Sequence, residues 1–383
     1  MYKEIVQFIK TLYPNEAFVP LHAPVFQGNE KKYLNDCVDS TFVSSVGEYV
    51  NKFEEMICKY TGAKFAIATT NGTSALHMAL ILVGVDRDTE VLTQSLTFVA
   101  TTNAISYLSA QSVFIDSAKD NLGMCPKSLE QFLVENADVI SGKTINKNTG
   151  KRISACVPMH VFGNPVDTDE IKRICDKYQI PLVEDAAESL GSTYKNEHTG
   201  LKGAVGILSF NGNKIVTCGG GGMIVTNNEV LAKRAKHLTT TAKRSHKWEF
   251  FHEEVGYNYR LPNLNAAMAC AQMETLPFFV ENKRQTASEY KKFFSQMDVR
   301  FIDESKNTQS NFWLNAIELK NAKERDEFLE YSNSNGVMTR PLWKLMSELP
   351  AFANCFKMPL INAEHYSNTI VNLPSSVRGK VSL

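Results

Sequence analysis

The stretch PLVEDAAES, at residues 181–189, joins a short apolar strand to two closely spaced carboxylates, Asp185 and Glu188. A second apolar stretch, AVGILSF at residues 204–210, leads through a turn of asparagine and glycine to Lys214. Ligands of open α/β sheets collect at the carboxyl ends of the strands. We therefore expect the two acids and the lysine to meet at one edge of a sheet.

Short apolar strands alternate with amphipathic helices from about Phe65 to Asn227. This alternation predicts an α/β fold with a mainly parallel sheet covered on both faces. Seven strands are expected, at residues 65–69, 90–93, 112–116, 155–161, 181–184, 204–210 and 222–226. The polar stretch at residues 141–152 lacks an apolar period and is expected to be a solvated excursion.

The length of 383 residues predicts more than one domain, because the chain is too long for a single simple core. We expect an N-terminal arm and a large cofactor-binding domain at residues 1–265. A linking helix and a smaller α+β domain are expected at residues 266–383.

A lysine and an acid at neighbouring strand ends indicate pyridoxal phosphate chemistry. Lys214 can form an imine and then act as nucleophile and proton carrier. A buried Asp185 can pair with a protonated pyridine nitrogen and keep the ring an electron sink. Glu188 can reach the phenolic oxygen of the ring, and Ser209 can contact a phosphate. The structural alternatives are ordinary, since a strand-end aspartate often caps a turn and a lysine after a strand is usually solvated.

The stretch FAIATTNGTSALHMAL, at residues 65–80, predicts an anion site. A short strand leads into Asn71, Gly72 and Thr73 at the start of an apolar-periodic helix. The first turn of a helix leaves backbone amides unpaired and carries a partial positive charge, and a glycine lets a phosphate approach the backbone. An ordinary capped helix is the alternative. The stretch is not a P-loop, because no GK[ST] follows.

Six motifs follow one another along the chain: NGTSALH, QSLTFVATTNAI, HVFGNPVD, VEDAAESLG, SFNGNKIVTCGGGGMIVT and GYNYRLPNLNAA. Together they resemble the DegT-type nucleotide-sugar aminotransferases, a fold-type-I pyridoxal phosphate family, from about Val19 to about Pro374. Within that family the chain is most similar to enzymes that aminate carbon 4 of a UDP-linked 4-keto-6-deoxy-N-acetylhexosamine. The resemblance implies a fold-type-I aminotransferase with pyridoxal 5'-phosphate as its cofactor.

The resemblance assigns roles to the predicted cofactor residues. Lys214 matches the lysine that forms the Schiff base, and Asp185 matches the partner of the pyridine nitrogen. The remaining matches are two ring contacts and three phosphate contacts, namely Phe98, Ala187, Gly72, Thr73 and Ser209. For the aromatic ring contact, packing on a helix face is the alternative. Glu188 stands where the family usually has glutamine or histidine, so a carboxylate there has to be protonated or paired.

Two further segments resemble parts of the family's shared or substrate-binding site. Asn258, in GYNYR, resembles the residue that reaches the phosphate from the neighbouring subunit, which implies a homodimer with shared active sites. The segment at residues 336–352 resembles the substrate side of the pocket, where Arg340 and Trp343 would lie near the nucleotide sugar. A surface loop with an incidental arginine is the alternative.

Four other positions are candidate sugar contacts. His160, in PMHVFG, is expected at a strand end beside the site, with a satisfied structural histidine as the alternative. The segment at residues 42–55 resembles one that enters the substrate pocket. Within it, Ser45, together with Ser44 and Glu48, is a candidate contact.

The resemblance implies a transamination in two halves, with L-glutamate as the donor and UDP-4-keto-6-deoxy-N-acetylglucosamine as the expected acceptor. The alternatives are amination of carbon 3 of a dTDP-linked keto sugar or an inosose, and a non-catalytic regulatory protein that binds the cofactor. Relatives that dehydrate the sugar carry histidine in place of the lysine, so Lys214 argues against that activity.

Composition excludes several other classes of protein. The 41 basic and 41 acidic residues balance, which gives no electrostatic argument for nucleic acid or an anionic membrane. The eight cysteines show no metal-ligand spacing, so we expect reduced thiols, no metal and a cytoplasmic location. The first sixteen residues are amphipathic and interrupted by charge, and we expect neither a signal peptide nor a membrane span.

Overall fold

The computed structural model describes residues 1–379, so the last four residues of the predicted C-terminal domain lie outside the described range. Its central sheet contains the seven predicted strands in the order β1, β11, β10, β7, β6, β2 and β3, with bridges at Cys156–Leu182 and Met159–Asp185 joining β6 to β7. The strands are β1 (Phe65–Thr69), β2 (Thr89–Gln94), β3 (Gln111–Ile115), β6 (Arg152–Val157), β7 (Val183–Asp185), β10 (Val205–Ser209) and β11 (Gly222–Thr226). Only β11 runs antiparallel to its neighbours, which confirms a mainly parallel sheet.

Two details of the predicted strands are wrong. Strand β6 ends at Val157 instead of Val161, because Pro158 has no amide for the ladder and Phe162 adopts a left-handed φ of 58° inside a short 3₁₀ turn. The expected solvated excursion at residues 141–152 instead holds β5 (Lys143–Asn146), which pairs with β4 (Ala137–Ile140) and with β6. Its Asn146 is buried and donates to Glu90 Oε2 at 2.7 Å, so the segment has a packing role.

Helices cover both faces of the sheet because alternate strand residues point to opposite sides. In β1, Ala66 and Ala68 join one apolar cluster with α3 (Glu48–Thr61) and α9 (Asn263–Phe294). Ile67, between them, joins a second cluster on the opposite face. The helices of that opposite face are α4 (Gly72–Leu82), α5 (Val99–Tyr107) and α8 (Glu229–Thr239). The helices α6 (Pro126–Asn136) and α7 (Thr168–Lys177) complete the covering over β2 and β3.

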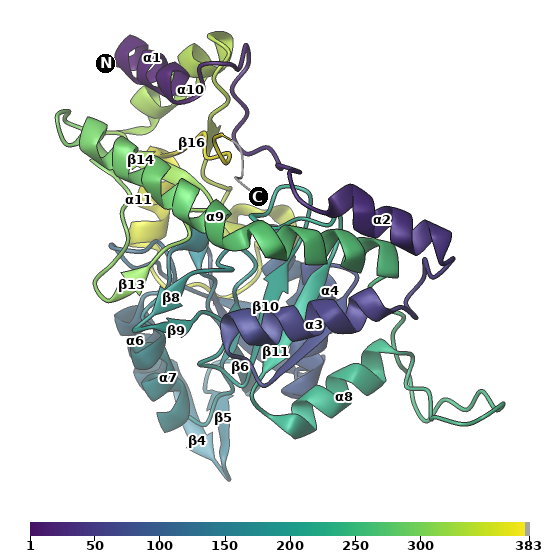
Figure 1. Cartoon of the computed structure of the whole chain (residues 1–383). Coiled ribbons are helices and arrows are strands. Elements are labelled where there is room, and N and C mark those ends of the chain that lie inside the picture. The colour runs from purple at the N-terminus through teal and green to yellow at the C-terminus, as the bar shows by residue number, and fades with distance from the viewer. Residues whose placement is uncertain (380–383) are drawn as a thin grey trace.

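The C-terminal part of the chain forms a second, antiparallel sheet of short strands. Its order is β12 (Arg300–Phe301), β14 (Asn315–Glu318), β16 (Ile370–Leu373) and β15 (Arg340–Pro341). The N-terminal helix α1 (Tyr2–Leu12) packs beside α10 (Ala322–Ser334) in the apolar cluster of this sheet, as Figure 1 shows. The division of the chain at residue 265 stays a prediction.

The remaining elements connect these layers. They are α2 (Glu30–Asp39), β8 (Thr193–Tyr194), β9 (Glu197–His198), β13 (Thr308–Gln309), α11 (Ile361–Thr369) and short 3₁₀ turns at residues 161–163, 346–348 and 350–352. The long helix α9 packs against α2 and α3 and leads from the large sheet to the small one (Figure 1). Within residues 1–379, no helix is long and apolar enough to cross a membrane.

Candidate active site

A cavity of about 290 Å³ lies at the carboxyl ends of β7 and β10, beside the N-terminus of α4. This is the sheet edge at which the sequence places the acids and the lysine. The predicted residues that line the cavity are Gly72, Thr73, Phe98, Asp185, Ala187, Glu188, Ser209, Lys214 and Trp343. The structure therefore brings together most of the predicted cofactor residues and one predicted substrate residue.

Asp185 is the last residue of β7 and is almost completely buried. Its Oδ2 accepts a hydrogen bond from Thr101 Oγ1 at 2.8 Å, and its Oδ1 accepts from the amide of Ala187 at 3.2 Å. Burial raises the pKa of this carboxyl, and the two hydrogen bonds oppose that shift. A cationic partner in the cavity, such as a protonated ring nitrogen, would compensate the buried charge.

Lys214 and Glu188 form an ion pair in the wall of the cavity. The distance from Lys214 Nζ to Glu188 Oε1 is 3.2 Å, and the Glu188 side chain is only 1% exposed. Glu188 Oε2 accepts from the amide of Phe162 at 2.9 Å. Burial raises the pKa of Glu188, and the nearby Lys214 opposes that shift. The requirement that a carboxylate at this position be paired is thus met by the lysine itself.

Two residues of the site were missed from the sequence. Thr101, on α5, holds Asp185 as described, and Trp313 lies under the reactive lysine, with Lys214 Nζ 4.0 Å from the centre of its ring. The Trp313 indole Nε1 donates to the carbonyl of Asn213 at 2.7 Å. The stretch that contains this tryptophan could be predicted only as a strand candidate, at residues 311–319.

The start of α4 and the end of β10 form a narrow gap that fits a phosphate. Asn71 caps the helix, its side chain accepting from the amide of Ser74 at 2.8 Å, and no acidic residue lies in the first turn. A Cβ built on Gly72 would lie 2.8 Å from Ser209 Cβ, so only glycine leaves the gap open. The amides of Gly72 and Thr73 and the hydroxyl of Ser209 are therefore suited to hold an anion.

Aromatic side chains form part of the wall of the cavity. Phe98 precedes α5 and is 46% exposed, which does not fit simple packing on a helix face. Its ring centre lies 6.0 Å from that of Trp343, which also contacts the ring of Phe162 at 5.2 Å. Ala187 lines the same cavity, and its role as the second ring contact stays a prediction.

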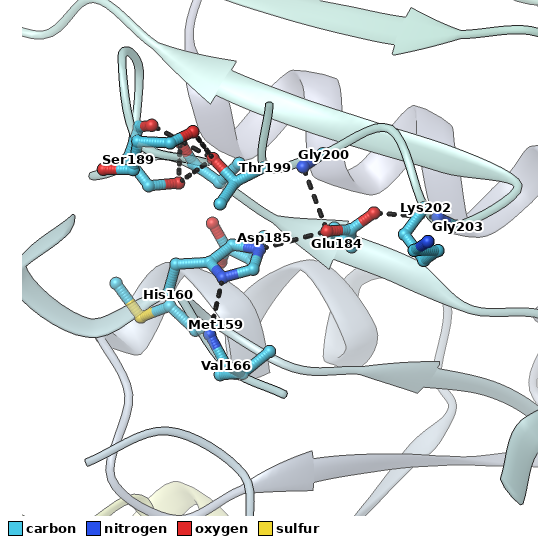
Figure 2. Close-up of polar contacts among 12 residues, drawn as sticks. Met159, His160, Val166, Glu184, Asp185, Ser189, Thr199, Gly200, Lys202 and Gly203 are labelled. Carbon is cyan, nitrogen blue, oxygen red and sulfur yellow. Dashed lines mark hydrogen bonds and ion pairs between the residues drawn. The ribbon is translucent and has the colours of Figure 1, made fainter. Parts of the chain in front are cut away.

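His160 is not brought to the cavity, although it lies near Asp185. It is fully buried, its Nδ1 accepts from the amide of Val166, and its Nε2 donates to Glu184, with both distances 3.2 Å. Figure 2 shows His160 between these two partners. The structure therefore corrects the expectation of a sugar contact in favour of the structural alternative, because both ring nitrogens are already bonded.

Three other predicted residues also lie outside the cavity of their own chain. Arg340 is exposed on the edge strand β15, where its guanidinium donates to the Asn333 side chain and to a neighbouring carbonyl. Ser45 lines a separate surface pocket of about 940 Å³, together with Glu48. Asn258 accepts from Arg260 Nε at 3.2 Å and does not line the cavity. The roles predicted for these three residues stay predictions.

Comparison with known proteins agrees with this geometry. Residues 24–380 match the model of the DegT/DnrJ/EryC1/StrS aminotransferase family. The chain is 38% identical over 333 residues to the putative pyridoxal phosphate-dependent aminotransferase EpsN of Bacillus subtilis (strain 168), covering 87% of this chain and 83% of that protein. It is 34% identical over 358 residues to the GDP-perosamine synthase of Escherichia coli O157:H7, covering 94% of this chain and 93% of that protein.

Solved structures share the fold. The aminotransferase TlmJ from Streptoalloteichus hindustanus superposes with a TM-score of 0.85 at 24% identity, covering 94% of this chain and 93% of that chain. Helicobacter pylori PseC, an aminotransferase involved in the biosynthesis of pseudoaminic acid, superposes with a TM-score of 0.83 at 23% identity, covering 93% of each chain. The protein therefore belongs to the DegT/DnrJ/EryC1/StrS family and is a pyridoxal-phosphate-dependent nucleotide-sugar aminotransferase of fold type I.

Proposed function

We propose that this enzyme transfers an amino group from L-glutamate to carbon 4 of a nucleotide-linked 4-keto-6-deoxyhexose. The observation that carries the proposal is the convergence of Lys214, Asp185 and the N-terminus of α4 on one cavity. Three relatives at 30% to 34% identity are named GDP-perosamine synthases, and perosamine is a 4-amino sugar. These names support amination at carbon 4.

The residues of the cavity have different roles in the proposed reaction. Bound pyridoxal phosphate supplies an electron sink that stabilises negative charge on the substrate carbon. Asp185 is placed to keep the ring nitrogen protonated, while Gly72 and Ser209 help to hold the phosphate. Phe98 and Ala187 would fix the plane of the ring. Lys214 Nζ is the nucleophile and then the group that accepts and returns a proton, which typically contributes about 100-fold to 10,000-fold in rate.

Two acceptors are candidates for the nucleotide sugar. The resemblance of the sequence motifs favours UDP-4-keto-6-deoxy-N-acetylglucosamine, whereas the named relatives favour a GDP-linked 4-keto-6-deoxy sugar. Both acceptors have a keto group at carbon 4, and the residues that line the cavity do not favour one nucleotide over the other. A dTDP-linked 3-keto sugar is the acceptor that would contradict the proposed position of amination.

The direct experiment supplies the purified enzyme with pyridoxal phosphate, nitrogen-15 glutamate and each of the three keto sugars in turn. Mass spectrometry should find the label in a nucleotide-linked 4-amino sugar from the UDP or the GDP acceptor. Lys214→Ala should abolish the product, whereas Lys59→Ala, at an exposed helix position, should not. Appreciable turnover by Lys214→Ala, or labelling of the 3-keto sugar alone, would overturn the proposal.

We also infer a homodimer in which each subunit completes the site of the other. The segment after α8 projects from the body of the molecule in Figure 1. It exposes Trp248 (74%), Phe250 (79%) and Val255 (83%), and Asn258 follows it without reaching the cavity of its own chain. Exposed apolar side chains grouped in this way are typical of a contact with another protein surface.

Subunit mixing tests the shared site. Lys214→Ala and Asn258→Ala should each be inactive or weakly active alone, because each damages both sites of a homodimer. If Asn258 acts across the interface, mixed dimers contain one intact site, and activity should return on mixing and refolding together. If activity does not return while light scattering shows mixed dimers, Asn258 does not act from the neighbouring subunit.

A further inference from the structure

The ammonium group of Lys214 has a single carboxylate partner within hydrogen-bond reach in residues 1–379. Its side chain is 11% exposed, and Nζ lies 3.2 Å from Glu188 Oε1, with the ring of Trp313 on another side. A lysine acts as a nucleophile only as the neutral amine, so its proton has to be accepted by another group. The aromatic ring cannot accept that proton.

Glu188 is held in place by a strained piece of backbone. Its Oε2 accepts the amide of Phe162, a bulky residue at a φ of 58°, which is rare outside glycine and asparagine. The next residue, Gly163, has a φ of 94°, and a Cβ there would lie 1.9 Å from Asn311 Oδ1. Asn311 in turn donates to the carbonyl of Glu188 at 2.9 Å. With Oε2 engaged by an amide, Oε1 is the oxygen left to face the lysine.

The other titratable groups around this pair are less suited to accept the proton. Asp185 interacts with the pair, but both of its oxygens already accept hydrogen bonds. The His22 ring centre lies 6.5 Å from that of Trp313, and His22 makes no hydrogen bond to Lys214. Burial favours the neutral form of Glu188, whose pKa it raises.

We propose that Glu188 is the proton acceptor that prepares Lys214 for attack on the cofactor carbonyl. The proton moves from Nζ to Oε1, so that the ammonium and carboxylate become a neutral amine and a neutral carboxylic acid. No other atom or electron is exchanged. The inference rests on the proposed role of Lys214 as nucleophile. Burial raises the pKa of Glu188, which agrees with its role as a proton acceptor.

The test uses the protein without cofactor, so it does not depend on turnover or on the identity of the sugar. Trace labelling with acetic anhydride, read by mass spectrometry of the peptide that contains Lys214, reports the fraction of neutral amine. Exposed Lys59 in the same digest is the internal reference between about pH 9 and about pH 6, a range in which an ordinary lysine amine loses its neutral form about tenfold per pH unit.

In the wild-type protein, labelling of Lys214 should level off over the lower part of this range, because transfer within the pair supplies neutral amine independently of pH. In Glu188→Gln the plateau should disappear, and Lys214 should fall about tenfold per unit like the reference. A wild-type curve that falls in parallel with Glu188→Gln across the whole range overturns the proposal, whatever the enzyme does with sugars.

Two further variants keep this result interpretable. Glu184→Gln replaces another fully buried glutamate four positions away, one that pairs with His160 and not with Lys214, and it should keep the wild-type plateau. Glu188→Asp retains a carboxylate and should retain part of the plateau, even if Glu188→Gln does not fold. Loss of the plateau in Glu184→Gln would assign the effect to packing and would contradict the proposal.

Discussion

Replacing Gly72 with alanine should close the gap that we assign to the cofactor phosphate. The new Cβ would lie 2.8 Å from Ser209 Cβ and 3.0 Å from Ser209 Oγ. Carbon atoms in ordinary contact are about 3.5–4.0 Å apart, so one side has to move. Ser209 cannot move freely, because β10 pairs it with Gly222 of β11.

The loss of stability should be small. Alanine is favoured over glycine in a helix by about 1 kcal/mol, and the overpacking costs about 1–3 kcal/mol. The net cost is therefore about 0–2 kcal/mol. The loss of affinity should be larger, because hydrogen bonds to a charged phosphate contribute about 1.5–3 kcal/mol each. Loss of one such bond corresponds to a dissociation constant about 10-fold to 100-fold higher.

The assay is a titration of the protein without cofactor, followed by absorbance, with pyridoxal phosphate and with pyridoxal. Gly72→Ala should weaken binding of the phosphate form and leave binding of pyridoxal nearly unchanged. Gly212→Ala is the matched control, because a Cβ there meets no atom within 4 Å. Equal losses for both ligands, or equal behaviour of the two variants, would refute the assignment of the phosphate gap.

Two other changes should be visible in stability measurements. Thr101→Val removes the hydroxyl that donates to Asp185 at 2.8 Å and should cost about 1–3 kcal/mol in urea unfolding. Thr102→Val loses bonds to the Val99 carbonyl and to the Met346 sulfur but none to a charged group, so it should cost less, and equal costs would contradict the buried bond to Asp185. Burial lowers the pKa of Lys283 to about 7, so the unfolded chain binds more protons than the folded protein between about pH 7 and about pH 10. Stability should therefore rise by about 2 kcal/mol between pH 7 and pH 9 in wild type relative to Lys283→Met, and parallel pH profiles would contradict a neutral buried lysine.

The strands of the large sheet could be predicted because their apolar runs are bounded by turn residues. For β1 and β11, the predicted bounds coincide with those in the structure. The end of β6 was missed although Pro158, which has no amide for the ladder, is visible in the sequence. The left-handed φ of Phe162 could not be predicted, since its amide donates to Glu188, 26 positions away. The pattern of apolar residues within one segment gives no information about contacts between residues that are distant in the sequence.

The same distinction between local pattern and distant contacts applies to the residues of the site. Asp185 ends β7 and Lys214 follows β10 after a short turn, so the topology of the sheet was enough to place them together. Trp313 donates to the carbonyl of Asn213, 100 positions away in the sequence, and no local motif predicts that contact. Arg340 was expected near the substrate because residues 336–352 resemble the family's substrate side, but in its own chain the guanidinium donates to the Asn333 side chain and to the Thr339 carbonyl.

The central claim is that one site carries out both halves of a transamination through Lys214. The most direct measurement is the visible absorption spectrum of the enzyme with pyridoxal phosphate, before and after L-glutamate and then after each 4-keto sugar. We predict that the band of the lysine-bound cofactor forms, disappears with glutamate and returns with a 4-keto sugar. If the wild-type protein never forms this band, or forms it equally in Lys214→Ala, the account is contradicted.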